Sequence, residues 1–290
     1  MKIDLMGDAE QIARRVLTNE GHTIPAATPA DDVIRNFLNV TRRTIPPMAY
    51  RVHTSQALSA RTLSADYLAG LDALRTEAKK GTPLRPRLSR RLMQADYEDM
   101  MLNDWGIHHL HLGMTIEADG FVKRTDVIAF AIAQPESGDL YLIDALPHAG
   151  AFVRQELLAA IEDDWPHLLD PYVLKGVEVT KGISDEELSS WRKAGTNAVV
   201  VTPGGRQIAA MGGGVSTAMT SMADQRALMH IKQVLRQVEK DVLADASRIE
   251  QAIGVPSSTM DIRLEAFGDE VLLRENETGI RLRWPGAEGA

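Results

Sequence analysis

Three short β-like runs stand close together in the middle of this 290-residue chain. They read WGIHHLHLG at 105–113, TDVIAFAIA at 125–133 and DLYLIDAL at 139–146. The segments between them, EADGFVKR and QPESG, contain the Gly, Pro, Asp and Ser residues that are typical of turns. The pattern predicts an antiparallel meander, which any fold of this chain has to accommodate.

Helical periodicity surrounds the meander and predicts an α+β fold. Its expected parts are a helical N-terminal third, a central antiparallel sheet bearing a histidine cluster, and a long C-terminal helix plus hairpin. In one helix, Ser184 and Glu187 have the spacing of a capping box. We expect regions 1–95, 96–215 and 216–290, or the last two as one continuous domain. Helices are predicted at 8–20, 31–43, 63–80, 149–165, 183–195 and 219–252, a hairpin at 197–211, and terminal strands at 261–275 and 278–284.

Composition excludes several classes of protein. The chain has no cysteine, so disulfide scaffolds, Cys-ligated metals and thiol nucleophiles are excluded. Its apolar stretches contain only a few residues, whereas a membrane span needs about 20. The N-terminal segment mixes acidic and basic residues and lacks the apolar core of a secretory signal. We therefore expect a cytoplasmic protein that has no membrane partner.

Histidine gathers in the first β-like run, which contains His108, His109 and His111. Because strand residues alternate between two faces, His109 and His111 share one face, while the neighbouring leucines share the other with His108. We expect the leucine face to be the core side. The two imidazoles then lie about 6–7 Å apart on an accessible face. His148 follows the third run and reaches the same face if that strand pairs near the first.

This arrangement suits metal-independent cleavage of RNA. A neutral imidazole can take the proton of a 2′-hydroxyl while a protonated one protonates the leaving 5′-oxygen, and histidine titrates in the right range for both roles. We predict His109 and His111 as base and acid, with His148 as an alternative member of the pair. Arg124 is the expected stabiliser of the developing charge, and Lys123 beside it is the alternative. No cofactor is expected in this chemistry.

A metal site is the second chemistry that fits. The H-x-H strand with His148, or with Asp144, has the ligand types of a zinc or iron centre that keeps an open position for water. His109, His111 and His148 are the predicted ligands in this alternative. A third interpretation leaves these histidines as half-buried polar residues without a site.

Positive charge gathers ahead of the histidine run. Residues 35–94 contain twelve Lys and Arg against three acidic residues, a block of +9, while the chain as a whole carries −8 and the remainder therefore −17. Arginine forks suit phosphate groups, so this block is a candidate RNA-binding segment. Alternatively, its arginines pair with the acidic stretches 162–164 and 185–187. The predicted nucleic-acid contacts are Lys79, Lys80, Arg85, Arg87, Arg90 and Arg91.

Residues 85–240 resemble an uncharacterised family of bacterial proteins. The resemblance rests on three segments in this order: DWGIHHLHLG, LIDALPHAG and GGGVST. A small antiparallel sheet carrying His and Arg also resembles metal-independent ribonuclease toxins. We therefore predict a nucleic-acid-processing protein, an endoribonuclease of toxin or phage-defence type. The alternatives are a His-ligated metallohydrolase and a non-enzymatic module that binds a protein partner through its acidic surface.

Overall fold

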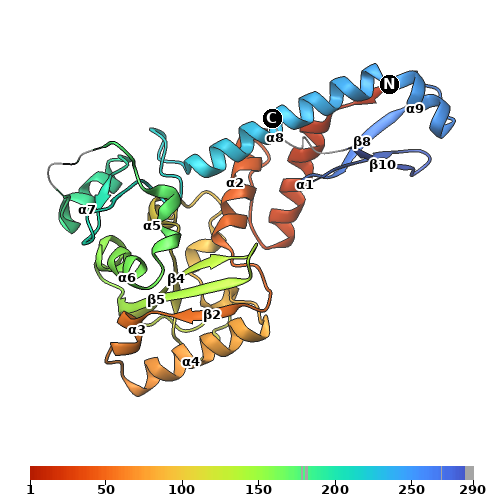
Figure 1. The fold of residues 1–290 in the computed structure, drawn as a ribbon. Coiled ribbons are helices and arrows are strands. Elements are labelled where there is room, and N and C mark those ends of the chain that lie inside the picture. Colours follow the sequence, from red (N-terminus) through yellow and green to blue (C-terminus); the bar gives the residue numbers. More distant parts are fainter. Residues whose placement is uncertain (178, 180–181, 269, 285–290) are drawn as a thin grey trace. The chain divides into compact units, whose positions relative to one another are not determined.

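The computed structural model describes residues 1–177, 179, 182–268 and 270–284. It has an α+β fold and divides into two compact units. Unit 1 is Met1–Asn39 with Asp224–Ala290, and unit 2 is Val40–Ala223; Figure 1 shows the elements of each. The predicted fold class is correct. The predicted regions 1–95, 96–215 and 216–290 are not the units found, because both ends of the chain contribute to one core.

Unit 2 is built on a four-stranded sheet with the order β2-β5-β4-β3. β3, β4 and β5 form the predicted antiparallel meander, and β2 pairs in parallel with β5. The sheet is therefore mixed rather than purely antiparallel, since a segment of the region expected to be helical supplies an edge strand. Its strands are β2 (Arg51–Thr54), β3 (His108–His111), β4 (Val127–Gln134) and β5 (Asp139–Pro147).

Helices and a small hairpin complete unit 2. Polar residues cap several of them: Ser64 begins the helix predicted at 63–80, and Ser184 and Glu187 form the predicted capping box. The elements are α3 (Gln56–Ala60), α4 (Ala65–Lys80), η1 (Arg85–Arg87), η2 (Arg90–Met93), α5 (Met100–Trp105), η3 (Ala151–Val153), α6 (Glu156–Asp164), η4 (Pro166–Leu168), η5 (Asp170–Tyr172), α7 (Asp185–Lys193), β6 (Val200–Val201) and β7 (Gln207–Ile208).

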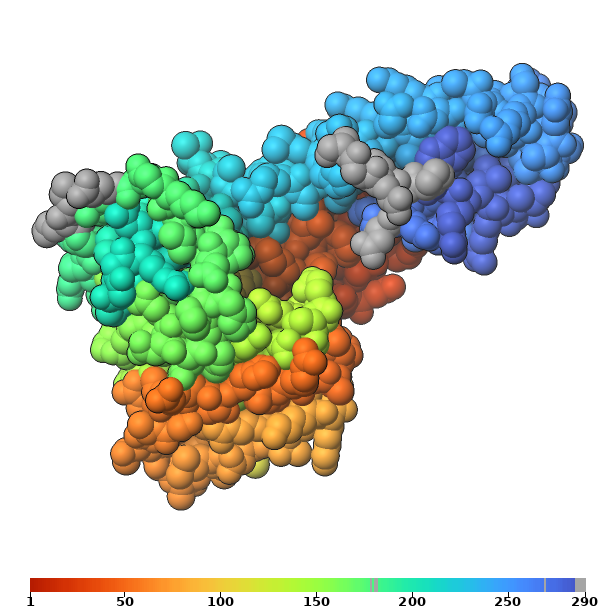
Figure 2. Space-filling view, in the orientation of Figure 1, coloured from red at the N-terminus to blue at the C-terminus, as the bar shows by residue number. Residues whose placement is uncertain are grey.

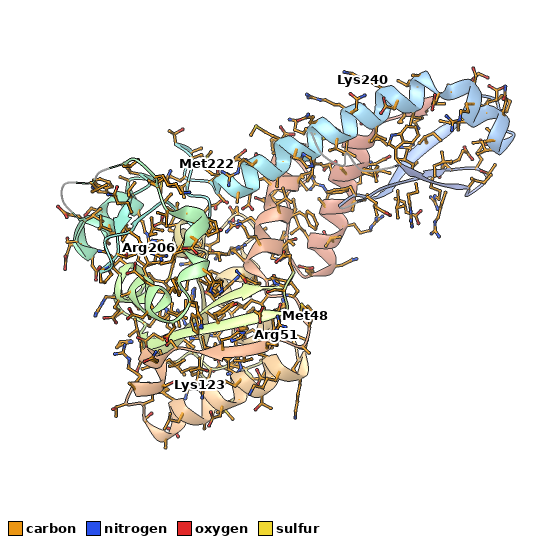
Figure 3. The ribbon with its side chains drawn as sticks, in the orientation of Figure 1. Met48, Arg51, Lys123, Arg206, Met222 and Lys240 are labelled. Carbon is orange, nitrogen blue, oxygen red and sulfur yellow. The ribbon has the colours of Figure 1, made fainter. Side chains whose placement is uncertain are left out.

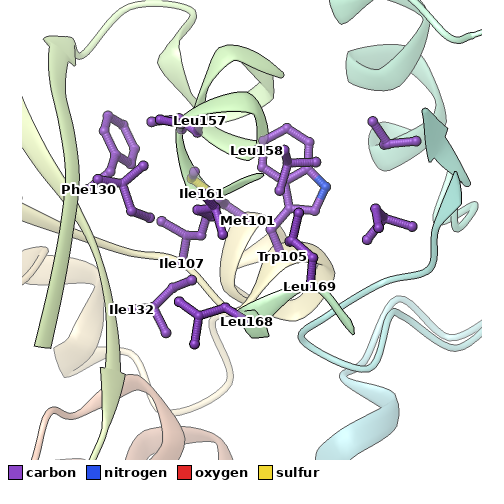
Figure 4. Packing of buried hydrophobic residues seen from close by; sticks show 14 of the residues in the cluster. Met101, Trp105, Ile107, Phe130, Ile132, Leu157, Leu158, Ile161, Leu168 and Leu169 are labelled. Atoms are coloured by element: carbon purple, nitrogen blue, oxygen red, sulfur yellow. The ribbon is translucent and has the colours of Figure 1, made fainter. Parts of the chain in front are cut away.

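The core of unit 2 lies between the sheet and two helices. Figure 4 shows Trp105 of α5 and Ile161 of α6 among the apolar residues that face β4. From β4, Phe130 and Ile132 join this cluster, because alternate strand residues point to one face. The sheet thus contributes one regular apolar face, and α5 and α6 cover it.

His109 and His111 lie on the same face of the sheet as this core. His109 stands opposite Phe130, and His111 opposite Ile128. The leucine side of β3 is buried as well, and α4 approaches it so closely that a Cβ on Gly70 would lie 1.9 Å from the Leu112 carbonyl oxygen. The expectation of an accessible histidine face is therefore wrong: His109 is 8% and His111 2% exposed, because elements pack on both faces.

Unit 1 joins the two ends of the chain, which are coloured red and blue in Figure 2. Its sheet has the order β1-β8-β9-β10, in which β1 pairs in parallel with β8. The single helix predicted at 219–252 is two helices, because Asp245 leaves the helical geometry between them. Lys240, labelled in Figure 3, projects from the first of these and is exposed. The elements are β1 (Lys2–Ile3), α1 (Leu5–Asn19), α2 (Ala30–Arg43, which continues into unit 2), α8 (Met222–Ala244), α9 (Ala246–Ile253), β8 (Asp261–Ala266), β9 (Val271–Glu275) and β10 (Arg281–Trp284).

Among the helices of the described ranges, none combines the length and the apolar character that crossing a bilayer requires.

Candidate functional site

His148 meets His109 and His111 of β3 at one end of the unit 2 sheet. The ring centroids of His109 and His111 are 6.3 Å apart, those of His109 and His148 6.4 Å, and those of His111 and His148 6.0 Å. The strand order explains this meeting. β5 is separated from β3 only by β4, and the His148 amide donates a 2.6 Å hydrogen bond to the Asp126 carbonyl ahead of β4.

A cavity of about 510 Å³ opens beside these rings. His109 and His148 line it together with Arg124, so the structure brings three of the four predicted catalytic residues to one space. His109 is nearly buried, whereas Arg124 is exposed. The remaining lining residues are Ser89, Arg91, Tyr97, Asp99, Met100, Met101, Phe152, Val153, Ser189, Arg192, Lys193 and Met219.

His111 stands behind the cavity rather than among its lining residues. Its Nδ1 accepts a 3.4 Å hydrogen bond from the Thr125 amide, which requires that nitrogen to be unprotonated. Since His111 is also 2% exposed, it is poorly placed to exchange protons with a substrate. The pair that can reach a common ligand is His109 with His148, instead of the predicted pair of His109 with His111.

Burial and like charge keep these imidazoles neutral. Burial lowers the pKa of His111 to about 3, and the nearby His109 and Arg124 act in the same direction. Burial also lowers the pKa of His148, Arg124 lowers it further, and Asp126 opposes the shift. The pKa of His109 is lowered by burial, against the opposing effect of Asp99. At neutral pH the unliganded site therefore presents neutral rings beside a cation.

Asp99 is a site residue that the sequence analysis missed. One of its oxygens, Oδ1, caps α5 by accepting hydrogen bonds from the amides of Met101 and Leu102, at 3.2 and 3.1 Å. The other, Oδ2, lies 3.6 Å from Nδ1 of His109. That Nδ1 is buried and has no hydrogen-bond partner in the described part of the chain. A carboxylate on this side favours a ring whose Nε2 serves the cavity. An acidic N-cap residue ten positions before a strand histidine was the available signal.

Phe152 and Lys193 are two further lining residues that no sequence pattern indicated. The Phe152 ring lies 5.0 Å from the His109 ring and 5.1 Å from the His148 ring, edge to face with both. Lys193, at the end of α7, is exposed. Neither residue stands in a motif, because tertiary packing alone brings η3 and α7 to the histidines.

The basic segment does not form one phosphate-binding track. Arg87 is 2% exposed, and its guanidinium is held by Glu77 and by the carbonyl oxygens of His111 and Gly113. The prediction that Arg87 contacts RNA is therefore wrong, because its side chain fixes β3 from inside. Arg90 forms ion pairs with Glu117 and Asp119.

The other basic residues of that segment are dispersed. Arg91 lines the cavity, Arg85 lies over the Phe121 ring, and Lys79 and Lys80 are exposed at the end of α4. For Arg87 and Arg90, the alternative in which the arginines of the basic block pair with 162–164 and 185–187 is also wrong. The ion-pair partners of Arg87 and Arg90 lie elsewhere, in α4 and in the loop before β4.

Asp144 binds Arg61 and not the histidines. It is 2% exposed, and Arg61 binds its carboxylate with two guanidinium nitrogens. In the described ranges, no three His, Asp or Glu side chains are grouped so that they could hold a metal ion. The zinc or iron alternative therefore gains no support from the arrangement of His109, His111 and His148, or from that of Asp144.

No protein-family model matches this chain, and neither does any curated protein or solved structure. The resemblance to a bacterial protein family stays a prediction, and the chemistry of the site rests on its own residues.

Proposed function

We propose that unit 2 is a metal-independent endoribonuclease of the cytoplasm, of toxin or phage-defence type, with its active site at the His109–His148 cavity. One observation carries the proposal: two imidazoles, 6.4 Å apart, line one cavity together with Arg124. The separation is too long for a hydrogen bond between the rings. It leaves space for a phosphodiester whose attacking and leaving oxygens each face one ring.

His148 is the general base of the proposed reaction. Burial and, after it, Arg124 lower the pKa of His148, so its ring is neutral and able to accept a proton at neutral pH. It takes the proton of the ribose 2′-hydroxyl, and the 2′-oxygen attacks the adjacent phosphorus. The bond from phosphorus to the 5′-oxygen breaks as the new bond forms. The product is a 2′,3′-cyclic phosphate.

His109 is the general acid. Its protonated form is favoured by Asp99 and, once substrate is bound, by the phosphate itself, which offsets the burial that lowers its pKa. It gives its proton to the leaving 5′-oxygen, and a 5′-hydroxyl end results. Arg124 stabilises the charge that develops on the non-bridging oxygens. Hydrolysis of the cyclic phosphate by water returns both rings to their starting protonation states.

The test is cleavage of a single-stranded RNA by the purified full chain. We expect cyclic-phosphate and 5′-hydroxyl ends, no cleavage where the 2′-hydroxyl is replaced by hydrogen, and unchanged activity after treatment with EDTA. His109→Ala and His148→Ala should each lower kcat/KM by about 100-fold or more, since a single acid or base contributes 10²–10⁴. His230→Ala, at an exposed position on α8, is the control and should match the wild type.

Three results would contradict the proposal. They are full activity in the His109→Ala/His148→Ala double variant, cleavage at 2′-deoxy positions, and loss of activity with EDTA that zinc or iron restores. The last result would instead favour the metallohydrolase. Absence of any cleavage, together with a protein captured through the acidic surface, would favour the interaction module.

A further inference from the structure

The cavity beside His109 and His148 has two chemically different walls. Exposed cationic side chains form one of them: Arg91, Arg124 and Lys193. Apolar side chains form the other: Met100, Met101, Phe152, Val153 and Met219. A ligand that uses both walls carries an anionic group and a flat or apolar group next to each other.

Among the residues that the structure describes, no carboxylate pairs with Arg124 or Lys193 of the cationic wall. Arg124 and Lys193 make no hydrogen bond or ion pair with any residue that the structure describes. The Arg91 guanidinium donates a 2.8 Å hydrogen bond to the neutral side chain of Gln94 and lies over the Tyr97 ring. Asp99 is the one carboxylate among the described residues that line the cavity, and its Oδ1 is occupied in capping α5. The space therefore favours a bound anion.

The apolar wall places an aromatic ring next to both proposed catalytic groups. Phe152 lies 5.0 Å from the His109 ring and 5.1 Å from the His148 ring. Proteins that read RNA stack unpaired bases on aromatic side chains in this way. A base held against Phe152 brings the phosphate attached to its ribose toward the two imidazoles.

Size restricts which RNA can use these walls. About 510 Å³ lies in the range of small-ligand pockets, and His109, at 8% exposure, is a recessed residue of its lining. A nucleotide held in a duplex keeps its base stacked and paired, so its base can enter such a pocket only after it is taken out of the helix.

Met219, which also lines this cavity, has a strained backbone conformation. Its φ is +63°, the one left-handed value of a non-glycine residue in the described ranges. A tight turn holds it there: its amide donates a 2.9 Å hydrogen bond to the Ser216 carbonyl, and Val215 bridges Ser221. The thioether lies against Gly195, where an added Cβ would be 2.2 Å from the sulfur. Strained backbone of this kind gathers at ligand-binding sites.

We infer that the cavity admits one unpaired nucleotide of a single-stranded RNA, with its base between Phe152 and Met219 and its 3′-phosphate on Arg124 and Lys193. The inference rests on the proposed function for its chemistry. It adds that single-stranded RNA, and not duplex RNA, is the substrate.

The experiment compares one RNA sequence in three forms: single strand, duplex, and hairpin with the cleaved site in its loop. We expect the single strand and the loop to be cleaved at similar rates, and the duplex about 100-fold more slowly, since extrusion of a paired base costs several kcal/mol. Equal rates on single strand and duplex would overturn the inference and leave the proposed ribonuclease standing.

Binding is measured separately with a fluorescent 2′-deoxy oligonucleotide, which transesterification cannot cleave. We expect the single strand to bind about 10-fold or more tightly than the duplex, because stacking on aromatic side chains is available only to unpaired bases. Binding of the two forms with equal strength, or of neither, would overturn the inference. An uncleaved RNA that still binds with the expected preference would refute the ribonuclease and support the assignment of the cavity.

Two matched pairs of variants locate the effect. Met219→Ala should raise KM for the single strand about fivefold with kcat within about twofold, as expected when contacts equal in ground and transition states are lost. Met229→Ala, at an exposed methionine on α8, is the control and should leave both constants unchanged.

Lys193→Gln should weaken binding of the oligonucleotide and reduce the salt dependence of that binding. Lys123→Gln is its control and should change neither the affinity nor the salt dependence. Unaltered KM and binding in Met219→Ala and Lys193→Gln would overturn the placement of the nucleotide.

Discussion

At the scale of single residues, burial and the nearby Arg124 together keep the imidazoles of the site neutral. Arg124 has no ion-pair partner in the described part of the chain, and it disfavours protonation of His109, His111 and His148 alike. Arg124 opposes protonation of these rings until an anion binds near them. The arrangement is thus suited to a site that becomes electrostatically balanced when substrate binds.

The pH dependence of cleavage tests this view. Because the pKa values of His109 and His148 are lowered in the free protein, the optimum of kcat/KM should lie below pH 6.5, while bound phosphate moves the optimum of kcat to higher pH. Arg124→Gln removes the repulsion and raises both pKa values. It should therefore shift the kcat/KM profile toward neutral pH and lower its maximum by about 10–100-fold, as loss of one charge-stabilising donor does.

Lys123→Gln is the control for this measurement, since Lys123 is an exposed neighbour that does not line the cavity. A profile that stays in place in Arg124→Gln would show that Arg124 does not govern the imidazoles.

At the scale of elements, α5 connects structure with chemistry through its first turn. Asp99 caps this six-residue helix with one oxygen and faces His109 with the other. The far end of α5 is fixed as well: the amides of Gly212 and Gly214 donate to the carbonyls of Asp104 and Asn103. The glycine-rich stretch is needed there for close approach, since a Cβ on Gly212 would lie 2.0 Å from the Leu102 carbonyl oxygen.

Two substitutions separate the roles of Asp99 as cap and as positioning residue. Asn is as good a cap as Asp, so Asp99→Asn should leave the free energy of unfolding within about 0.5 kcal/mol, whereas Asp99→Ala should lose about 1 kcal/mol. Both variants lack the charge that raises the pKa of His109. The basic limb of the kcat/KM profile should therefore move to lower pH, with activity reduced about tenfold.

Chemical denaturation and the pH profile are the two measurements. Ser64→Ala, which removes the cap of α4, should cost stability and leave the pH profile unchanged. A wild-type profile in Asp99→Asn would mean that Asp99 acts only as a cap.

At the scale of the whole molecule, the two units have separate cores. The cluster around Trp105 and Ile161 lies in unit 2, and the cluster around Leu5 and Val242 lies in unit 1. The cavity and every residue that lines it belong to unit 2. Stability of unit 1 and activity are therefore expected to be independent properties of this protein.

Calorimetry should show two unfolding transitions, as chains with separate cores generally do. Leu5→Ala, at a fully buried position of unit 1, should lower one transition, since such truncations cost about 2–5 kcal/mol. Ile161→Ala, fully buried in unit 2, should lower the other and reduce cleavage. A single transition that both variants shift equally would contradict the independence of the two cores.

The sequence by itself determined the features whose causes are local. The β-like runs at 125–133 and 139–146, bounded by turn residues, predicted β4 and β5, and the Ser184–Glu187 spacing predicted the capping box, because these signals join residues close in the chain. The histidine pattern indicated where to look for a site. Only the tertiary structure decided that helices bury the face carrying His109, that Arg87 fixes β3, and that both chain ends form one unit. The cavity also depends on the tertiary structure, because packing that no local pattern predicts brings together residues as far apart as Ser89 and Met219.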